Sequence, residues 1–252
     1  MIRQIRNLAP SCLERDVARD SNLDLSDVVA GYGATRILHG VSFVVPPNAV
    51  TLLIGRNGSG KSTLLKSMFG LADLFSGTVR LGRHDLTSLS IADRILRGVR
   101  YVPQSGGVFG SLRVEENLQL AASLADRDRL QTTIGEIFEL FPALKSIRSK
   151  RAGELSGGQQ RLLAFAMGTM TRPAFLLVDE PSAGLSPLLA RQVIQHLGQI
   201  RDQQKTGILL VEQNVKEGCR VADYIYLLRD GHLHWHGLPD ELLSQPSLAA
   251  FL

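Results

Sequence analysis

The chain has 252 residues, of which 44% are hydrophobic and 21% are charged, and its formal net charge is +4. This length suits one large α/β domain, or a core with an inserted subdomain, and either is long enough to bury a core. The mild charge gives no sign of a nucleic-acid surface, and no segment approaches the run of about eighteen apolar residues that spans a membrane. Cys12 and Cys219 lie far apart and fit no metal-ligand spacing, which favours a reducing cytosol.

Residues 1–22 are predicted to be a polar tail, because they show no sustained hydrophobic periodicity. This stretch also lacks the apolar centre of a signal peptide, which argues against export. A disordered extension explains it, and the alternative is a short amphipathic segment that docks on a partner.

Two strands are predicted at Leu23–Ala30 and Ile37–Val45. Tyr32 lies between them and could stack on a nucleotide base, although a half-buried strand tyrosine would look the same. Further on, Thr78–Leu81 is predicted to be a short strand after a break at Ser76 and Gly77, and Ile91–Arg97 a helix.

A glycine-rich loop follows the apolar run Val50–Ile54 and leads into a helical pattern. The loop consists of Gly55, Arg56, Asn57, Gly58, Ser59, Gly60, Lys61, Ser62 and Thr63. It fits the pattern G-x-x-x-x-G-K-[ST], in which backbone N–H groups and a helix N-terminus surround phosphate oxygens. We expect Lys61 to reach the β- and γ-phosphates of ATP, Ser62 to bind Mg²⁺, and Thr63 to contact a phosphate nearer the ribose.

Two polar segments follow later in the chain. Gln104 comes directly after the predicted strand Val99–Val102, where a side chain can reach a ligand above a parallel sheet. Residues 113–141 then show helical spacing without a strand, which indicates a mostly helical insertion.

A second anion site is predicted where a helix opens at residues 155–160. Ser156 occupies an N-cap position, followed by Gly157, Gly158 and Gln159, so that a hydroxyl, free N–H groups and a helix dipole lie together. A plain helix cap is the alternative.

A buried strand, Ala174–Val178, ends on Asp179 and Glu180. Two acids at the end of a central strand are costly unless they face a cation or a reacting water. We expect Asp179 to bind Mg²⁺ through water and Glu180 to polarise the attacking water. Gln213 follows the next buried strand, Gly207–Val211, and should face the same site.

The predicted hairpin after the turn Asp230-Gly231 carries His232, His234 and His236 at period two. This spacing could hold a metal, but the solvated face of an edge hairpin explains it as well. Helices are predicted at Pro187–Ile200 and Pro239–Ser244.

The order of these motifs, with Leu-Ser-Gly-Gly-Gln at residues 155–159, resembles the ATP-binding cassette family over residues 23–252. The resemblance implies an α/β fold: a P-loop NTPase core, an antiparallel β subdomain and an α-helical subdomain inserted at about residues 105–168. It also implies that Tyr32 stacks on adenine and that Gln104 links Mg²⁺ and water to the transporter contact. The family works as a head-to-tail dimer, in which ATP lies between residues 55–63 of one subunit and residues 156–158 of the other.

Four segments resemble one of the two ATPases of importers for branched-chain amino acids. They are Tyr101–Gln104, Val114–Leu118, Glu180–Pro187 and Leu210–Asn214. The resemblance implies an ATPase on the cytoplasmic face of the inner membrane, peripheral to two permease subunits and served indirectly by a substrate-binding protein. It also implies a second ATPase subunit in a heterodimer, with a homodimer as the alternative, and no nucleic-acid partner.

Two residues depart from the general pattern of the family. Gln213 stands where most cassettes have a histidine, and Ser186 where most have an aspartate. A glutamine amide can donate to a γ-phosphate but does not titrate near neutral pH. Two rival functions stay open: an importer of urea or short amides, and a soluble cassette ATPase unconnected with transport.

Overall fold

The computed structural model describes residues 21–122 and 130–245, so the predicted tail lies outside it apart from residues 21 and 22. The strands are β1 (Leu23–Tyr32), β2 (Thr35–Val45), β3 (Val50–Ile54), β4 (Asp73–Leu81), β5 (His84–Asp85), β6 (Val99–Val102), β7 (Phe175–Asp179), β8 (Gly207–Val211), β9 (Tyr224–Arg229) and β10 (His232–Gly237). The helices are α2 (Lys61–Phe69), α3 (Ile91–Leu96), α4 (Val114–Ala122), α5 (Leu130–Leu140), α6 (Pro142–Lys145), η3 (Ala152–Glu154), α7 (Gly157–Thr169), α8 (Pro187–Gln204), α9 (Val215–Gly218) and α10 (Pro239–Leu243).

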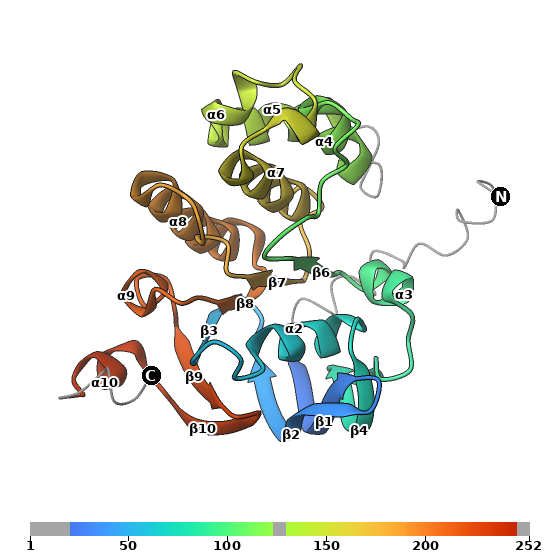
Figure 1. Ribbon diagram of the computed structural model, residues 1–252, viewed down its shortest axis with the longest axis vertical. Coiled ribbons are helices and arrows are strands. Elements are labelled where there is room, and N and C mark those ends of the chain that lie inside the picture. Colours follow the sequence, from blue (N-terminus) through green and yellow to red (C-terminus); the bar gives the residue numbers. More distant parts are fainter. Residues whose placement is uncertain (1–20, 123–129, 246–252) are drawn as a thin grey trace.

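The strands form two sheets (Figure 1). One sheet has four strands in the order β2-β1-β4-β5, all antiparallel. The other has six strands in the order β10-β9-β3-β8-β7-β6, parallel from β9 to β6, with β10 antiparallel at its edge. Strands β3, β7 and β8 are buried on both faces, and their sequences are accordingly apolar apart from Thr51 in β3 and Asp179 at the end of β7.

Helix α2 lies between the two sheets and shares a hydrophobic core with both. Leu64, Leu65 and Met68 of this helix are fully buried there, together with Leu53 of β3. Leu52 of β3 points to the opposite face, into a second core that includes α8 and the helical layer. Because successive side chains of β3 point to opposite faces of the sheet, this strand contributes to both hydrophobic cores.

Helices α4, α5, α6 and α7 form a layer at the far end of the molecule from the four-stranded sheet (Figure 1). They occupy the segment in which the sequence predicts a helical subdomain, about residues 105–168. Phe138, Phe141 and Phe165 pack within this layer and join the core that contains α8.

The predicted short strand Thr78–Leu81 is wrong in its extent, because β4 begins already at Asp73. The strand continues through the glycine break because it pairs with β1 along its length, and Gly77 sits in a bulge of that ladder. Gly77 has a φ of +85°, and a Cβ there would lie 2.5 Å from the carbonyl oxygen of Asp27. Tertiary pairing therefore overrides the local break signal.

The C-terminal hairpin forms as predicted, with β10 at the edge of its sheet and its three histidines exposed. His232 stacks on His39, whereas His236 lies beside Tyr224. Within residues 21–122 and 130–245, no three side chains of histidine, cysteine, aspartate or glutamate are grouped so that they could hold a metal ion. None of the helices in these ranges is both long and apolar enough to cross a membrane.

Candidate nucleotide-hydrolysis site

The phosphate loop joins the buried strand β3 to α2 at the carboxyl end of the parallel sheet. Gly55 has a φ of +151°, and a Cβ there would lie 2.1 Å from the carbonyl oxygen of Leu228, so only glycine fits. Lys61 begins α2, and its Nζ donates to the carbonyl oxygens of Gly55 and Arg56 at 2.8 and 2.9 Å. Burial lowers the pKa of the Lys61 ammonium, while the charges of Glu180 and Asp179 oppose that shift. The ammonium is thus anchored across the loop.

The loop has the donors that a polyphosphate requires. In the described part of the chain, the N–H groups of Gly58, Gly60 and Lys61 have no hydrogen-bond acceptor. The hydroxyl of Ser59 is also without a partner, although Ser59 is only 4% exposed. Such donors at a helix N-terminus fit the phosphates of a nucleotide.

Asp179 ends β7, and each of its carboxylate oxygens accepts a hydrogen bond from a hydroxyl group. Ser62 donates to Oδ1 at 3.1 Å, and Tyr101 donates to Oδ2 at 3.2 Å. Burial raises the pKa of the Asp179 carboxyl, and the two hydroxyl groups act against this shift. A hydroxyl and a carboxylate side by side are oxygen ligands of the kind that Mg²⁺ prefers, so these residues fit the metal.

Glu180 follows Asp179 and is held by two glutamines. Its Oε2 accepts from Nε2 of Gln104 at 2.5 Å and from Nε2 of Gln213 at 2.8 Å. Its φ of +46° is left-handed, which costs a residue other than glycine roughly 1 kcal/mol or more. Since its N–H donates to Val211 at the end of β8, neighbouring strands hold this backbone conformation.

The structure therefore brings together residues that the sequence places far apart. Gln104 follows β6, Glu180 follows β7 and Gln213 follows β8, and these three strands are neighbours in the sheet. Gln213 thus faces the site as expected, with its amide donating to Glu180, while a contact of that amide with a γ-phosphate stays a prediction.

Sequence reasoning missed Tyr101 and Glu212. Glu212 is 2% exposed and accepts from both the N–H and the hydroxyl of Ser182, so it holds the loop after Glu180. A charged residue at the end of a buried strand was the available signal for Glu212. For Tyr101 there was none, because a tyrosine in an edge strand is ordinary.

The residues at the start of α7 are arranged as a capping box. The hydroxyl of Ser156 accepts from the N–H of Gln159, and Oε1 of Gln159 accepts from the N–H of Ser156. Ser156 and Gly157 are exposed, and Gly158 packs near Leu185. In residues 21–122 and 130–245, no hydrogen bond joins this segment to the phosphate loop. The side chain of Gln159 thus caps its own helix, and its predicted contact with a nucleotide stays a prediction.

The remaining predicted residues differ in their exposure and in the elements that carry them. Arg56, Asn57 and Gly58 are exposed, while Thr63 is buried in α2. Tyr32 is 40% exposed at the end of β1, with Nζ of Lys66 5.8 Å from its ring centroid. Ser186 accepts from the N–H of Leu189 and caps α8, a role that aspartate also performs.

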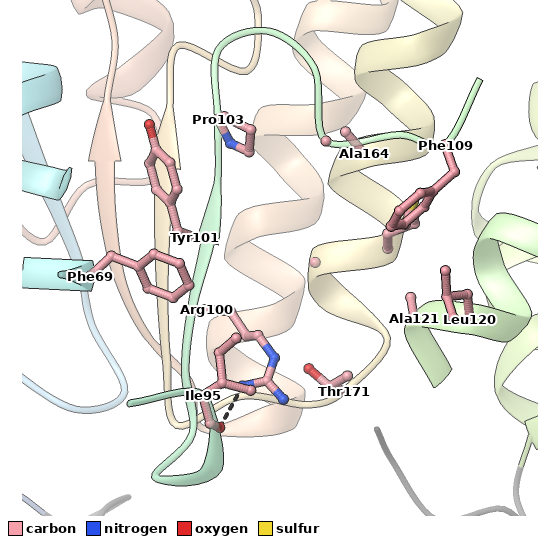
Figure 2. A pocket seen from close by; sticks show the side chains of 13 residues that line it. Phe69, Ile95, Arg100, Tyr101, Pro103, Phe109, Leu120, Ala121, Ala164 and Thr171 are labelled. Carbon is pink, nitrogen blue, oxygen red and sulfur yellow. Dashed lines mark hydrogen bonds between the residues drawn. The ribbon is translucent and has the colours of Figure 1, made fainter. Parts of the chain in front are cut away.

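An apolar groove of about 360 Å³ lies beside the site, between the core and the helical layer. Figure 2 shows Phe69 and Tyr101 on one side of it and Phe109 and Leu120 on the other. Phe109 is 52% exposed at its rim. Pro103, which directly precedes Gln104 in the loop after β6, forms part of the wall of the groove.

Residues 38–183 match the sequence model of the ABC transporter family, which is more than half of the chain. The chain therefore belongs to the family of ABC transporter ATPases, and it is an ATPase subunit. It is 42% identical to a protein of Archaeoglobus fulgidus named probable branched-chain amino acid transport ATP-binding protein LivF, over 85% of this chain and 91% of that one. It is 37% identical to a Pseudomonas aeruginosa protein named high-affinity branched-chain amino acid transport ATP-binding protein BraG, over 90% and 97%.

Solved structures show the same fold. A nucleotide-free ATP-binding cassette from an ABC transporter superposes with a TM-score of 0.79 at 26% identity, over 92% of this chain and 98% of that one. The ADP conformation of MJ1267, another such cassette, gives a TM-score of 0.78 over the same shares. The predicted family and fold class are confirmed.

Proposed function

We propose that this chain hydrolyses MgATP to drive the import of branched-chain or other hydrophobic amino acids. The class of transported substrate is supported by the sequence identity of 37–42% to two relatives that are named for branched-chain amino acid transport. The chemistry is supported by the two carboxylates of Asp179 and Glu180 beside the phosphate loop.

In this proposal the residues of the loop bind and orient ATP. The free N–H groups and Lys61 hold the β- and γ-phosphates, and Tyr32 stacks on the base. Ser62 and Asp179 would hold Mg²⁺, with Gln104 nearby, and the metal would supply positive charge that offsets the charge on the phosphates. Glu180 either accepts a hydrogen bond from the attacking water or removes a proton from it. Gln104 and Gln213 orient the carboxylate for this step.

The second part of the proposal concerns assembly. Since Ser156 and Gly157 are exposed and unconnected with the phosphate loop of their own chain, they would complete the site of a second ATPase subunit, in a heterodimer or a homodimer. The apolar groove would receive an apolar segment of a permease, because its rim exposes Phe109 beside the loop that carries Gln104. This would place the chain peripherally at the cytoplasmic face of the membrane, with a substrate-binding protein across it.

Affinity capture from native membranes tests the transport assignment. The tagged chain should recover two polytopic permeases and a second cassette ATPase, and cells that lack the chain should lose uptake of radiolabelled leucine. Phe109→Asp should reduce permease recovery at least about tenfold, since a charge at the rim opposes burial of an apolar partner.

The matched control is Leu243→Asp, which changes an equally exposed apolar residue on α10 and should leave recovery unchanged. Recovery with ribosomal or DNA-associated proteins and without a permease would refute the transport assignment. Normal leucine uptake together with lost uptake of urea would refute the amino acid assignment.

A further inference from the structure

Tyr101 belongs both to the apolar groove and to the hydrolysis site. It lies in β6, the edge strand of the six-stranded sheet, and its ring is 5.6 Å from the ring of Phe69, centroid to centroid. The ring lines the groove, and Figure 2 shows the hydroxyl pointing away from Phe69 and Ile95. That hydroxyl is the group that donates to Oδ2 of Asp179.

The carboxylate of Asp179 needs to be held in one orientation. The terminal torsion of an aspartate side chain is broad, so packing alone does not fix the plane of the carboxylate. Ser62 holds Oδ1 from α2, and Tyr101 holds Oδ2 from β6, so the plane is fixed from two directions. Without the tyrosine hydroxyl, Oδ2 of a residue that is only 2% exposed would lose its hydrogen-bond donor.

We propose that Tyr101 is a positioning residue whose hydroxyl orients Asp179 for metal binding, and whose ring carries that contact to the wall of the groove. The proposal rests on the proposed role of Asp179 in holding Mg²⁺. A tyrosine suits this task because its ring is rigid and has one apolar and one polar end. A partner in the groove would thus touch the side chain that orients the metal-binding carboxylate.

The test is the binding of Mn²⁺, in place of Mg²⁺, to the purified full chain with one equivalent of the non-hydrolysable analogue AMP-PNP. Electron paramagnetic resonance reports free and bound Mn²⁺ independently of turnover. Tyr101→Phe keeps the ring and removes only the hydroxyl, so the dissociation constant for Mn²⁺ should rise roughly three- to tenfold. Binding of ATP in excess EDTA should change less than about twofold, because the hydroxyl of Tyr101 is hydrogen-bonded to Asp179 and not to Lys61 or the loop amides.

The matched control is Tyr224→Phe, which removes a hydroxyl hydrogen-bonded to His236 in the C-terminal hairpin. It should leave Mn²⁺ binding unchanged. Tyr101→Met is the second test variant: it also lacks the hydroxyl, its flexible side chain can fill the same space, and it should weaken Mn²⁺ by a similar factor. Thermal unfolding of each variant shows that it is folded.

The outcomes separate this proposal from the proposed function. If Asp179→Asn retains wild-type Mn²⁺ binding, Asp179 does not hold the metal, and both proposals about it are wrong. If Asp179→Asn loses Mn²⁺ while Tyr101→Phe binds it within about twofold of wild type, only the role of Tyr101 is overturned. Equal weakening by Tyr101→Phe and Tyr224→Phe would overturn that role too.

Discussion

At the scale of single residues, Glu180 shows how the site is held before nucleotide binds. Its backbone has a left-handed conformation, and one carboxylate oxygen accepts from two glutamine amides. Strained backbone persists only where the surroundings determine it, and here β8 and two strand-end loops do so. The carboxylate is therefore oriented by two neutral donors.

Glu180→Gln should leave ATP binding within about threefold and lower kcat at least about a hundredfold, because an amide accepts a water proton poorly. Phosphate release and equilibrium binding of a fluorescent ATP analogue measure the two effects. Glu136→Gln, which changes a surface carboxylate on α5, is the control and should have normal turnover. Wild-type turnover in Glu180→Gln would remove Glu180 from the mechanism.

The same turnover assay tests Gln213→Ala, which removes one of the two hydrogen-bond donors to Glu180. We expect kcat to fall about tenfold with little change in KM, as Gln104 still holds the carboxylate. Gln203→Ala on the exposed side of α8 is the matched control. Full turnover in Gln213→Ala would show that its amide has no catalytic role.

At the scale of elements, the helix that carries the phosphate loop depends on a buried arginine from α3. Arg94 is 2% exposed, and burial lowers the pKa of its guanidinium. Its nitrogens donate to the carbonyl oxygens of Ser67 and Met68 at the C-terminal end of α2, at 2.9 and 2.7 Å. Gly70 leaves room for it, since a Cβ there would lie 3.2 Å from Cζ of Arg94. The helix dipole also favours a cation at this end of the helix.

Arg94→Met should destabilise the protein by about 3 kcal/mol, because it leaves buried carbonyl groups without donors. For a chain of this length that corresponds to a Tm lower by roughly 6–12 °C, measured by circular dichroism. Arg97→Met at the end of the same helix should lower Tm by only about 1–2 °C. Equal effects of the two substitutions would contradict the capping role of Arg94.

At the scale of the whole molecule, the two segments that are predicted to bind ATP lie apart and share no hydrogen bond within residues 21–122 and 130–245. The phosphate loop lies at the end of β3, while the exposed Ser156 caps α7 in the helical layer. Each segment has donors at a helix N-terminus, and a second chain would be needed to bring two such segments together.

Ser156→Arg should therefore leave ATP binding by the isolated chain unchanged but weaken ATP-dependent association at least about tenfold. The measurement is sedimentation velocity of the Glu180→Gln form with ATP, alone and with the related ATPase recovered by capture. Ser146→Arg, at another exposed serine of the helical layer, is the control. Normal association of the Ser156→Arg form would contradict the proposed shared site.

Most of the fold could be predicted from the sequence because its signals are local. The apolar runs of β3, β7 and β8 predict buried parallel strands, and the helical spacing of apolar residues after residue 113 predicts the helical layer. The prediction failed in part at β4, where long-range pairing with β1 continued the strand through Ser76 and Gly77.

The sequence by itself determined the phosphate loop, the capped start of α7 and the pair Asp179-Glu180, because each needs adjacent residues in one backbone arrangement. Only the tertiary structure decided which side chains hold those acids. The donors Tyr101, Gln104 and Gln213 come from two other strands or the loops after them, and they meet the acids because parallel strands end at one edge of the sheet.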